Sequence, residues 1–492
     1  MSDVTFLCVQ EPAQFIAGQW QTGEGGDPLV DVNPFDQSEV ARLAPLSREQ
    51  LDHAIESTAR GRDVMRSMPP SERSRLLRDA ADWLEARQEA FLTLSAMEAG
   101  SSRLKATFEL GAAISELREA ASFPGRMHGT LVPSSVPGKQ SRVVREPMGA
   151  LAVISPFNFP LNLSMRSVAA MLATGNSVLL KPDQRTYLTG GLLLAEMFQA
   201  VGLPADALNV VVGDAKMIGA AMTSHPVFAG VSFTGSTGVG QYIGIECARH
   251  FKKSSLELAG NNPMLVLSDA DVEAAADAAV FGSLLHQGQI CMSTNRVLVS
   301  RSLYEDVVTA LEQRVRSIKA GNPLEDGVIL GPLIDRRQAD AAKQRIDSSV
   351  SQGARLICGG EQDGNLITPA LLVDVKPEMP AAKEEMFGPC VTVLPFEDDD
   401  AVLAAANVEG GALSASVFTR RERGPIEQML QAGMIHFNDQ GVNDEPQTLF
   451  TGLGASGMGQ HNGHWGLNAW TRERWISDQG DAYRQFPFPT QG

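Results

Sequence analysis

The sequence ALAVISPFNFPLNLSMRSVAAMLATGNSVLLKP (150–182) contains one complete strand–helix–strand unit. Residues 150–155 and 177–182 are short apolar runs that we interpret as buried strands, and the helical pattern MRSVAAMLATG (165–175) lies between them. Strands that alternate with helices in this way are typical of an α/β fold with a parallel sheet. The alternation continues through three further strand-like runs, LNVVVG (208–213), VSFTG (231–235) and PMLVLS (263–268).

A second series of strand-like runs begins near residue 296 and predicts a second α/β domain. The segment HQGQICMSTNR (286–296) lies near the junction of the two series. We therefore expect two parallel-sheet α/β domains. The strands of the second series are RVLVS (296–300), ARLICGG (354–360), CVTVLPF (390–396), SASVFT (414–419) and MIHFND (434–439).

Residues 48–122 are predicted to be helical. Ser47 followed three residues later by Gln50 is typical of a helix start. The stretch 71–100 keeps helical spacing throughout and predicts one long helix that ends at a glycine, and a third helix follows it. MHGTLVPSSVPGKQSRVVREPM (127–148) is β-like and broken by Pro and Gly, which predicts a protruding hairpin.

Composition and charge argue against several classes of partner. The chain has 492 residues, 43% of them hydrophobic and 20% charged, which suits a soluble protein of two or more domains. Its net charge is −17 and no basic cluster exceeds two residues, so neither nucleic acid nor an anionic membrane is an expected partner. There is no apolar run of about 18 residues and no charged region typical of a signal peptide, so a cytoplasmic protein is expected.

The five cysteines are odd in number, widely spaced and without a C-x-x-C pair. We therefore expect neither a disulfide framework nor a zinc site, and a reducing compartment fits. Apart from His461 and His464, which are three positions apart, the histidines are widely separated, so no metal site is expected. The cysteines are Cys8, Cys247, Cys291, Cys358 and Cys390.

Three strand ends carry candidate binding residues. The glycine-rich turn in VSFTGSTGVG (231–240) opens a helix and would present backbone N–H groups to a phosphate. Lys181 ends a strand on the rim where ligands bind in such sheets. Asn158 lies between two prolines, and a rigid amide suits an oxyanion hole. Each also has an ordinary interpretation, as a tight turn, a surface lysine or a turn-forming asparagine.

Cys291 and Glu257 are the candidate reactive residues. Cys291 follows a glycine-rich turn and precedes a β-like run, and Glu257 ends an apolar run. Alone, each has a commoner role, as an inert thiol or a surface carboxylate. Together, a soft nucleophile and a carboxylate that activates water are the minimum for oxidising an aldehyde through a thioester.

These motifs resemble the aldehyde dehydrogenase superfamily almost from end to end, and as a set they are specific. The resemblance implies a Rossmann-like NAD(P)-binding domain over 1–127 and 148–258 and a catalytic domain over 259–458. It also implies oligomerisation segments at 128–147, a hairpin, and at 459–492, the tail that pairs with this hairpin. The expected assembly is a homodimer or homotetramer. The motifs are FIAGQW (15–20), NPF (33–35), ISPFNFP (154–160), KPDQ (181–184), FTGSTGVG (233–240), LELAG (256–260), GQICMS (288–293), EEMFGP (384–389), SASVFT (414–419) and HFNDQGVNDEP (436–446).

The resemblance also implies residue roles. Cys291 would be the nucleophile, Glu257 the general base and Asn158 the oxyanion amide. Lys181 would hold the adenosine ribose and Ser236 the pyrophosphate of NAD or NADP. Further implied cofactor contacts are Ile154, Ser155, Pro156, Phe157, Gln184, Gly235, Gly240, Leu258, Glu385 and Phe387. The implied aldehyde channel is lined by Phe159, Arg166, Ile290, Met292 and Phe450.

The segments SPFNFPLNLSMRSVA, HQGQICMST and NDQGVNDEP resemble bacterial benzaldehyde, vanillin and salicylaldehyde dehydrogenases, which points to an aromatic aldehyde. Phe and Met walls suit a planar ring, and Arg166 is either a partner for a ring hydroxyl or carboxylate or part of a structural ion pair. An aliphatic aldehyde or a semialdehyde is the alternative substrate. The presence of Glu257 argues against CoA-acylating chemistry, and the intact reactive residues argue against a silent binding protein.

Three positions depart from the family pattern. Ala259 stands where a glycine is usual beside the base, and Thr451 replaces a glycine of the Phe-Gly-Gly that borders the pocket. Gln184 stands where many NAD-specific members carry Glu, whose charge would repel a 2′-phosphate. Neutral Gln removes that repulsion, so we predict that NADP is accepted beside NAD.

Overall fold

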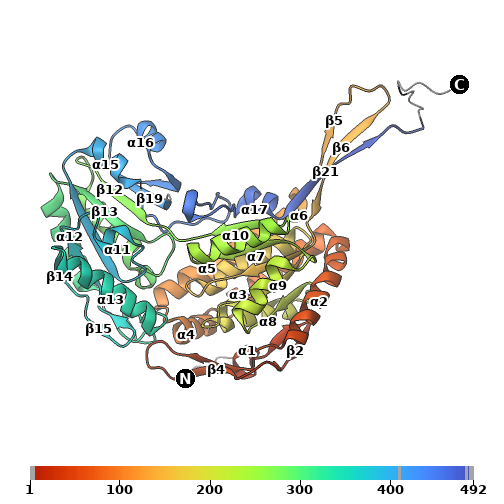
Figure 1. Ribbon diagram of the computed structural model, residues 1–492, viewed down its shortest axis with the longest axis horizontal. Helices are drawn as coiled ribbons and strands as arrows, with labels where there is room; N and C mark the ends of the chain where they lie inside the picture. The colour runs from red at the N-terminus through yellow and green to blue at the C-terminus, as the bar shows by residue number, and fades with distance from the viewer. Residues whose placement is uncertain (1–5, 408–411, 482–485, 487–492) are drawn as a thin grey trace.

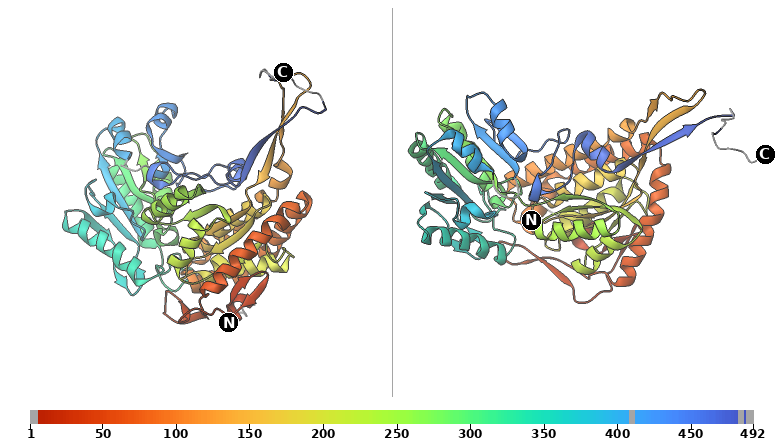
Figure 2. Two further views of the ribbon diagram at one scale, coloured as in Figure 1. Left: turned by 45° about the vertical axis from the view of Figure 1, so that its right-hand side comes forward. Right: turned by 45° about the horizontal axis from the view of Figure 1, so that its top comes forward.

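The structure, a computed structural model, describes residues 6–407, 412–481 and 486. Figure 1 shows two lobes, each built around a seven-stranded sheet, and an arm that projects from the first lobe. Figure 2 shows from two further sides that the arm stands clear of both lobes. The α/β class with two mainly parallel sheets is therefore confirmed.

The first sheet has the order β11-β10-β7-β8-β9-β1-β2. The strands from β11 to β9 run parallel, whereas β1 pairs antiparallel with β9 and β2. The buried apolar runs predicted around 150–182 are its central strands, β7 and β8. The bounds are β1 (Gln14–Ile16), β2 (Gln19–Gln21), β7 (Ala150–Ile154), β8 (Ser177–Lys181), β9 (Leu208–Val210), β10 (Phe228–Thr234) and β11 (Lys253–Glu257).

The second sheet has the order β14-β17-β18-β13-β12-β19-β20, and only β14 runs against its neighbour. The strand PMLVLS, which the sequence pattern assigned to the first series, is β12 at the centre of this second sheet. That assignment was wrong because alternation along the chain does not reveal where the chain crosses between sheets. The bounds are β12 (Asn262–Val266), β13 (Thr294–Ser300), β14 (Arg355–Cys358), β17 (Ala370–Val373), β18 (Cys390–Phe396), β19 (Ala412–Phe418) and β20 (Ala432–Phe437).

The arm is a three-stranded antiparallel sheet of the order β21-β6-β5. The hairpin expected near 128–147 is present as β5 and β6, and the C-terminal strand β21 pairs with β6 along its whole length. Most of the tail at 482–492 lies outside the described residues. The remaining strands are β5 (Thr130–Val132), β6 (Gln140–Pro147), β21 (Thr471–Asp478), β3 (Leu29–Val32), β4 (Glu39–Leu43), β15 (Gln362–Asp363) and β16 (Leu366–Ile367).

Helices cover both faces of the first sheet. On one face α7 packs on β7 and β8, with α3 and α5 outside it, and on the other face α2, α9 and α10 enclose a second apolar core. The capping box predicted at Ser47 and Gln50 is confirmed at the start of α2. The helices are α1 (Leu7–Gln10), α2 (Arg48–Ser67), α3 (Pro70–Glu85), α4 (Gln88–Ala99), α5 (Arg103–Ala120), α6 (Phe123–Arg126), α7 (Pro160–Ala173), η1 (Leu188–Leu192), α8 (Leu193–Ala200), α9 (Ala215–Ser224), α10 (Thr237–Arg249) and α17 (Gly463–Ala469).

The long helix predicted over 71–100 is two helices, α3 and α4. Arg87 leaves helical geometry, its guanidinium lies 4.0 Å above the Trp83 ring and it donates to the Trp83 carbonyl. This contact ends α3 without a glycine or proline, so the sequence pattern gave no warning of the break. The helices of the second lobe and its junction are α11 (Val272–Leu284), η2 (Leu285–Gly288), α12 (Tyr304–Ser317), α13 (Arg336–Ser351), α14 (Pro380–Lys383), α15 (Asp399–Ala406), α16 (Gly424–Met429) and η3 (Gly454–Ser456).

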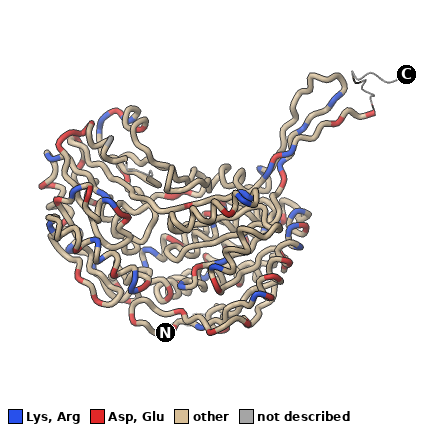
Figure 3. Tube along the Cα trace, viewed as in Figure 1, with Lys and Arg blue, Asp and Glu red and all other residues tan. Residues whose placement is uncertain are grey.

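Charged residues of both signs are interspersed over the two lobes and the arm (Figure 3). In this view Lys and Arg alternate with Asp and Glu over both lobes. Among the described helices, none has the length and apolar character needed to cross a membrane.

Candidate active site

Four parallel strands of the first sheet end at one edge, and each end carries a predicted site residue. Lys181 and Glu257 are the last residues of β8 and β11, Ser155 follows β7 and Gly235 follows β10. Because parallel strands place their carboxyl ends together, these residues converge on one edge, which is where ligands bind in open α/β sheets.

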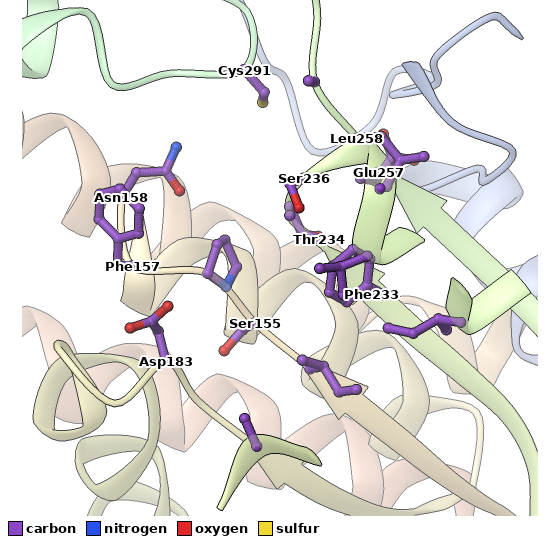
Figure 4. Close-up of a pocket in the computed structure, with 18 of the residues that line it drawn as sticks. Ser155, Phe157, Asn158, Asp183, Phe233, Thr234, Ser236, Glu257, Leu258 and Cys291 are labelled. Carbon is purple, nitrogen blue, oxygen red and sulfur yellow. The ribbon is translucent and has the colours of Figure 1, made fainter. Parts of the chain in front are cut away.

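A cavity of about 1020 Å³ opens at this edge and is lined from both lobes. Figure 4 shows Cys291 in a loop above the cavity, with Asn158 to one side and Glu257 to the other. The structure thus brings all three predicted reactive residues to one cavity. The predicted residues in its lining are Ile154, Ser155, Pro156, Phe157, Asn158, Lys181, Gly235, Ser236, Glu257, Leu258, Cys291, Glu385 and Phe387.

Cys291 lies in the loop between η2 and β13. The two residues His286 and Gln287 in η2 have left-handed backbone, with φ values of 50° and 57°. Asn262 Nδ2 donates to the carbonyl of Cys291 at 2.7 Å and to that of Ser293 at 2.9 Å. The cysteine backbone is therefore fixed to the start of β12.

The Asn158 side chain reaches this loop from the first lobe. It is 5% exposed, and its Nδ2 donates to the carbonyl of Gln289 at 2.8 Å. This bond joins the turn after β7 to the residue two positions before Cys291. An amide so held is a preorganised donor beside the thiol.

Glu257 is 2% exposed, and neither carboxyl oxygen has a hydrogen-bond partner among the described residues. Burial raises the pKa of this carboxyl to about 8, with Arg166 opposing the shift. The nearest ring nitrogen, His461 Nε2, is 3.7 Å from Oε1. Burial, followed by Arg166, lowers the pKa of His461 to about 3, so this contact is not an ion pair at neutral pH.

Gly459 and Thr451 form the wall behind Glu257. A Cβ at Gly459 would lie 2.4 Å from Ser255 Oγ and 2.9 Å from Glu257 Oε1, so only glycine fits there. The Thr451 hydroxyl donates to the Gly459 carbonyl at 2.7 Å. The departure from the family pattern at Thr451 therefore ties down the segment that confines the carboxyl.

Loss of water contact raises the pKa of the Cys291 thiol to about 12. Arg166 is the cation that works against this shift, and the carboxylates of Glu257 and Glu385 add to it. In this arrangement the thiol is neutral, so its ionisation depends on positive charge or dipoles near the sulfur.

The part of the cavity between α9 and α10 is suited to a nucleotide. Ser236 is exposed at the N-terminal end of α10, where unpaired N–H groups and the helix dipole favour phosphate. Lys181 is 7% exposed, its Nζ donates to the Pro182 carbonyl, and burial lowers its pKa. Glu385 accepts from the Gly260 N–H at 3.5 Å, its one hydrogen bond to the part of the chain that the structure describes, and burial raises its pKa to about 7.

Several lining residues were not named as site residues from the sequence. Many of them come from the faces of α9, α10 and α13, and the others lie on β10 or in the loops that follow β8 and β11. Arg185 pairs with Asp183 at 2.9 Å and with Asp335 of the second lobe at 2.7 Å, which links the lobes beside the cavity. Small residues spaced four apart on α9 were the only sequence feature that pointed to an open helix face. The unanticipated residues are Asp183, Arg185, Ala215, Lys216, Gly219, Ala220, Phe233, Thr234, Gly238, Val239, Tyr242, Ile243, Ala259, Arg337, Gln338 and Arg345.

Two predicted cofactor residues are not in the lining. The Gln184 amide donates to the Gly213 carbonyl at 2.5 Å. Gly240 lies against Leu258, whose Cδ2 would be 2.2 Å from a Cβ at this position. Gly240 therefore lets α10 approach the strand that carries Glu257, and its contact is with protein.

The predicted channel residues Phe159, Ile290, Met292 and Phe450 belong to an apolar cluster against which Cys291 packs. None of them lines the cavity described above. Arg166 is 4% exposed, lies 4.0 Å above the Phe450 ring, bonds to Asp444 and is 3.6 Å from Glu116. The ion-pair interpretation of Arg166 is thus present in the structure. Within the described residues, no group of three or more His, Cys, Asp or Glu side chains is placed to hold a metal.

Three comparisons with known proteins bear on this site. The sequence model of the aldehyde dehydrogenase family matches residues 20–476. The chain is 43% identical to a benzaldehyde dehydrogenase of Bacillus subtilis and 40% identical to a vanillin dehydrogenase of Corynebacterium glutamicum, in both cases over 96% of this chain and 98% of the relative. The solved structure of an aldehyde dehydrogenase from Brucella melitensis biovar abortus 2308 superposes with a TM-score of 0.94 at 31% identity, covering 99% of this chain and 100% of that one.

Proposed function

The chain belongs to the aldehyde dehydrogenase family, and we propose that it oxidises an aromatic aldehyde of the benzaldehyde or vanillin type to the carboxylic acid with NAD or NADP. The observation that carries the proposal is the convergence of Cys291, Asn158 and Glu257 on one cavity that also reaches the first turn of α10. A nucleophile, an amide donor, a base and a phosphate-binding turn are the groups that this reaction requires.

Acylation uses Cys291 and Asn158. The Cys291 thiol gives up its proton to water, and the thiolate sulfur then adds to the aldehyde carbon while the carbonyl electron pair moves onto oxygen. Asn158 Nδ2 donates to that oxyanion, together with the Cys291 N–H by family resemblance. Removing one such donor typically costs about 10²–10³ in rate. Burial raises the pKa of the Cys291 thiol. The positive charge of Arg166, which lies beside the apolar cluster, opposes this shift and so favours the reactive thiolate.

The residues along the cavity fit a dinucleotide. The Lys181 ammonium has further donors that could bind a ribose. Ser236 and the first turn of α10 could bind the pyrophosphate. The Glu385 carboxyl could bind the second ribose. A Cβ at Gly238 would meet nothing within 4 Å, so the turn is open to a ligand. A bound NAD or NADP would supply the acceptor for the hydride of the former aldehyde carbon, so that the acyl group would stay on Cys291 as a thioester.

Deacylation uses Glu257. Its carboxylate removes a proton from water, the water oxygen attacks the thioester carbon, and the C–S bond breaks to release the acid and the Cys291 thiolate. The carboxyl has no other hydrogen-bond partner among the described residues, so both oxygens are available to water.

An aromatic ring suits the apolar cluster beside Cys291. Phe159, Met292 and Phe450 offer flat and polarisable surfaces to a planar ring. Arg166 borders the same cluster, with Asp444 and Asn462 behind it. We propose that Arg166 binds a hydroxyl or carboxylate on the substrate ring while it keeps its ion pair with Asp444.

We propose that both NAD and NADP are accepted. Gln184 carries no charge that would repel a 2′-phosphate, and its amide is tied to the Gly213 carbonyl away from the cavity. The Asp183 carboxylate in the lining is neutralised by Arg185 at 2.9 Å. Lys181 and Lys216 provide positive charge in the same lining.

We also propose that the protein is a homodimer or homotetramer held through the arm. The outer strand β5 is exposed along its length, and Leu131 is 84% and Trp475 64% exposed. Large apolar side chains on an unpaired β-edge are a natural place for a second copy of the chain.

The proposal is tested by following cofactor reduction with benzaldehyde, vanillin, salicylaldehyde, hexanal and succinate semialdehyde, each with NAD and with NADP. We expect a preference of tenfold or more in kcat/KM for the aromatic aldehydes, which is about 1.4 kcal/mol in transition-state free energy. A preference for hexanal or the semialdehyde would replace the aromatic substrate and keep the mechanism. Absence of NADP turnover would refute dual cofactor use, and absence of any turnover would favour a silent binding protein.

A further inference from the structure

A fully buried ion pair lies beneath the segment that carries Asn158, and the mechanism above does not use it. Lys105 and Glu109 are four residues apart on α5, both are 0% exposed, and Lys105 Nζ is 2.5 Å from Glu109 Oε2. Ser101 Oγ accepts a second bond from this ammonium at 3.1 Å. Two buried charges contribute little net stability compared with apolar residues, so their position calls for another explanation.

Glu109 caps the helix that follows Asn158. The residue before α7, Phe159, has no side chain that bonds to the first turn. Glu109 Oε1 instead accepts from the backbone N–H of Leu161 at 2.9 Å and of Asn162 at 3.3 Å. First-turn N–H groups have no partner within their own helix, and a carboxylate is favoured at that end. The start of α7 is therefore fixed to α5.

Lys105 holds the residue next to Asn158. Its ammonium lies 4.5 Å from the centroid of the Phe159 ring, and a cation over an aromatic face is attracted to it. Phe159 also meets the His286 ring edge-on, with centroids 5.7 Å apart. Burial, then Lys105, lowers the pKa of His286, so the imidazole packs as a neutral ring.

These contacts enclose Asn158 from two directions. On the α7 side, Glu109 and Lys105 fix the residues from Phe159 to Asn162. On the Cys291 side, the Asn158 amide donates to the carbonyl of Gln289. A rotation of the first turn of α7 would move the amide relative to the sulfur, and displacements of about 1 Å can cost about 10²-fold in rate.

We propose that Lys105 and Glu109 are positioning residues for the oxyanion amide. Glu109 sets the first turn of α7, Lys105 neutralises Glu109 and holds Phe159, and together they place Asn158 beside the Cys291 sulfur. This inference rests on the proposed function and adds to it a pair that touches neither substrate nor cofactor.

The test is a double-mutant cycle between the pair and Asn158. The variant Lys105→Met/Glu109→Gln removes both charges at once, so no single charge is left buried, and Asn158→Ala removes the amide. We expect the pair variant to slow single-turnover acylation of benzaldehyde about 10- to 100-fold, with KM for NAD unchanged. In the Asn158→Ala background the same change should cost less than about threefold.

An equal loss of acylation rate in the wild-type and Asn158→Ala backgrounds would overturn the inference, because it would show that the pair affects acylation independently of Asn158. If the pair variant does not fold, Glu109→Gln alone, which keeps an oxygen acceptor for the Leu161 N–H, enters the same cycle with the same two outcomes. If Asn158→Ala itself leaves acylation unchanged, the proposed oxyanion role fails, and that result is distinct from additivity.

Glu98→Gln is the matched control. Glu98 is also 0% exposed and accepts from the first N–H groups of η1, Leu188 at 2.7 Å and Thr189 at 2.9 Å. It is a tertiary helix cap that does not line the cavity. We expect its effect on acylation to be the same with and without Asn158. If Glu98→Gln were coupled to Asn158 as strongly as the Lys105–Glu109 variant is, the coupling would not be specific to that pair, and the inference would be overturned.

Discussion

Two thiols of this chain have the same raised pKa and different surroundings. Burial raises the pKa of both Cys291 and Cys390 to about 12. Cys390 is 2% exposed within a core cluster, whereas Cys291 lines the cavity beside Asn158 and Glu257. Reactivity at this site therefore follows from the neighbours that a bound aldehyde would meet, and the resting pKa of the thiol does not distinguish the two.

Replacing Cys291 tests that argument directly. Cys291→Ala should abolish aldehyde oxidation, because no other thiol lines the cavity in the described part of the chain, and cofactor binding should remain. The measurements are steady-state cofactor reduction and a binding titration with NAD. Cys390→Ala is the control and should keep most of the activity. Substantial turnover by Cys291→Ala would refute the nucleophile assignment.

The raised pKa of Glu257 predicts a pH dependence. Below about 8 its carboxyl is protonated and cannot accept a proton from water, and above that value it is an ionised base. Thioester hydrolysis should therefore rise with pH through about 8, approaching tenfold per pH unit on the acid side. Rapid-quench measurement of acyl-enzyme breakdown from pH 6 to 9.5 gives this profile.

Glu257→Gln should remove the rise and let the acyl-enzyme accumulate, with the initial burst of reduced cofactor retained. A wild-type profile that is flat across this range, or an unchanged steady-state rate in Glu257→Gln, would argue against Glu257 as the base.

At the scale of elements, α7 connects the proposed oxyanion amide, which lies just before its first turn, with a buried charge cluster about two turns further along. Arg166 on this helix bonds to Asp444, and Glu116 on α5 is 3.6 Å from its Nε. Burial raises the pKa of Glu116 to about 8 despite the nearby guanidinium. The helix thus carries a cation that is balanced by carboxyl groups and lies against the ring of Phe450.

Arg166→Met should change both stability and substrate ranking. Removing the guanidinium leaves buried carboxyls unpaired, and breaking such a pair costs about 3–5 kcal/mol in the free energy of unfolding. If Arg166 also binds ring substituents, the kcat/KM advantage of vanillin or salicylaldehyde over benzaldehyde should fall about tenfold. Thermal unfolding and the substrate panel measure the two effects. Arg166→Lys keeps the charge and serves as the comparison, and an unchanged ranking in Arg166→Met would refute the substrate role.

The sequence predicted those features that depend on local pattern. Apolar runs of strand length located β7, β8 and β10, and the order of motifs located Cys291, Glu257 and Asn158. The break between α3 and α4 could not be predicted, because it depends on the Arg87 guanidinium over Trp83 and on no helix-breaking residue. The same holds for Glu109, whose contact with Leu161 joins residues 52 positions apart.

At the scale of the whole molecule, the site exists only because two sheets meet. Glu257 ends the last strand of the first sheet, and β12, which follows within a few residues, is central to the second. Two contacts join the lobes beside the cavity: Arg185 pairs with Asp335 of the second lobe, and Phe157 packs against Phe387 of the second lobe. The sequence alternation predicted two sheets, but the residues that bridge them have no spacing rule that a single sequence would reveal.

The arm exposes large apolar side chains that a single copy of the chain leaves uncovered. Leu131 on β5 is 84% exposed and Val132 43%, while the strand has no neighbour on its outer side within the described chain. An apolar edge strand left open would favour uncontrolled pairing, and a second copy that covers it removes that hazard. Leu131→Asp with Val132→Asp should therefore weaken assembly, because two charges would have to be buried at the interface.

Sedimentation velocity across protein concentration measures this effect, and we expect the double variant to shift toward the monomer while the wild type remains a dimer or tetramer. Leu324→Asp, at a residue that is 50% exposed on the second lobe, is the control and should leave assembly unchanged. None of the lining residues of the cavity lies on the arm, so the dissociated variant should still bind NAD. Unchanged sedimentation of the arm variant would place the subunit contact elsewhere on the surface.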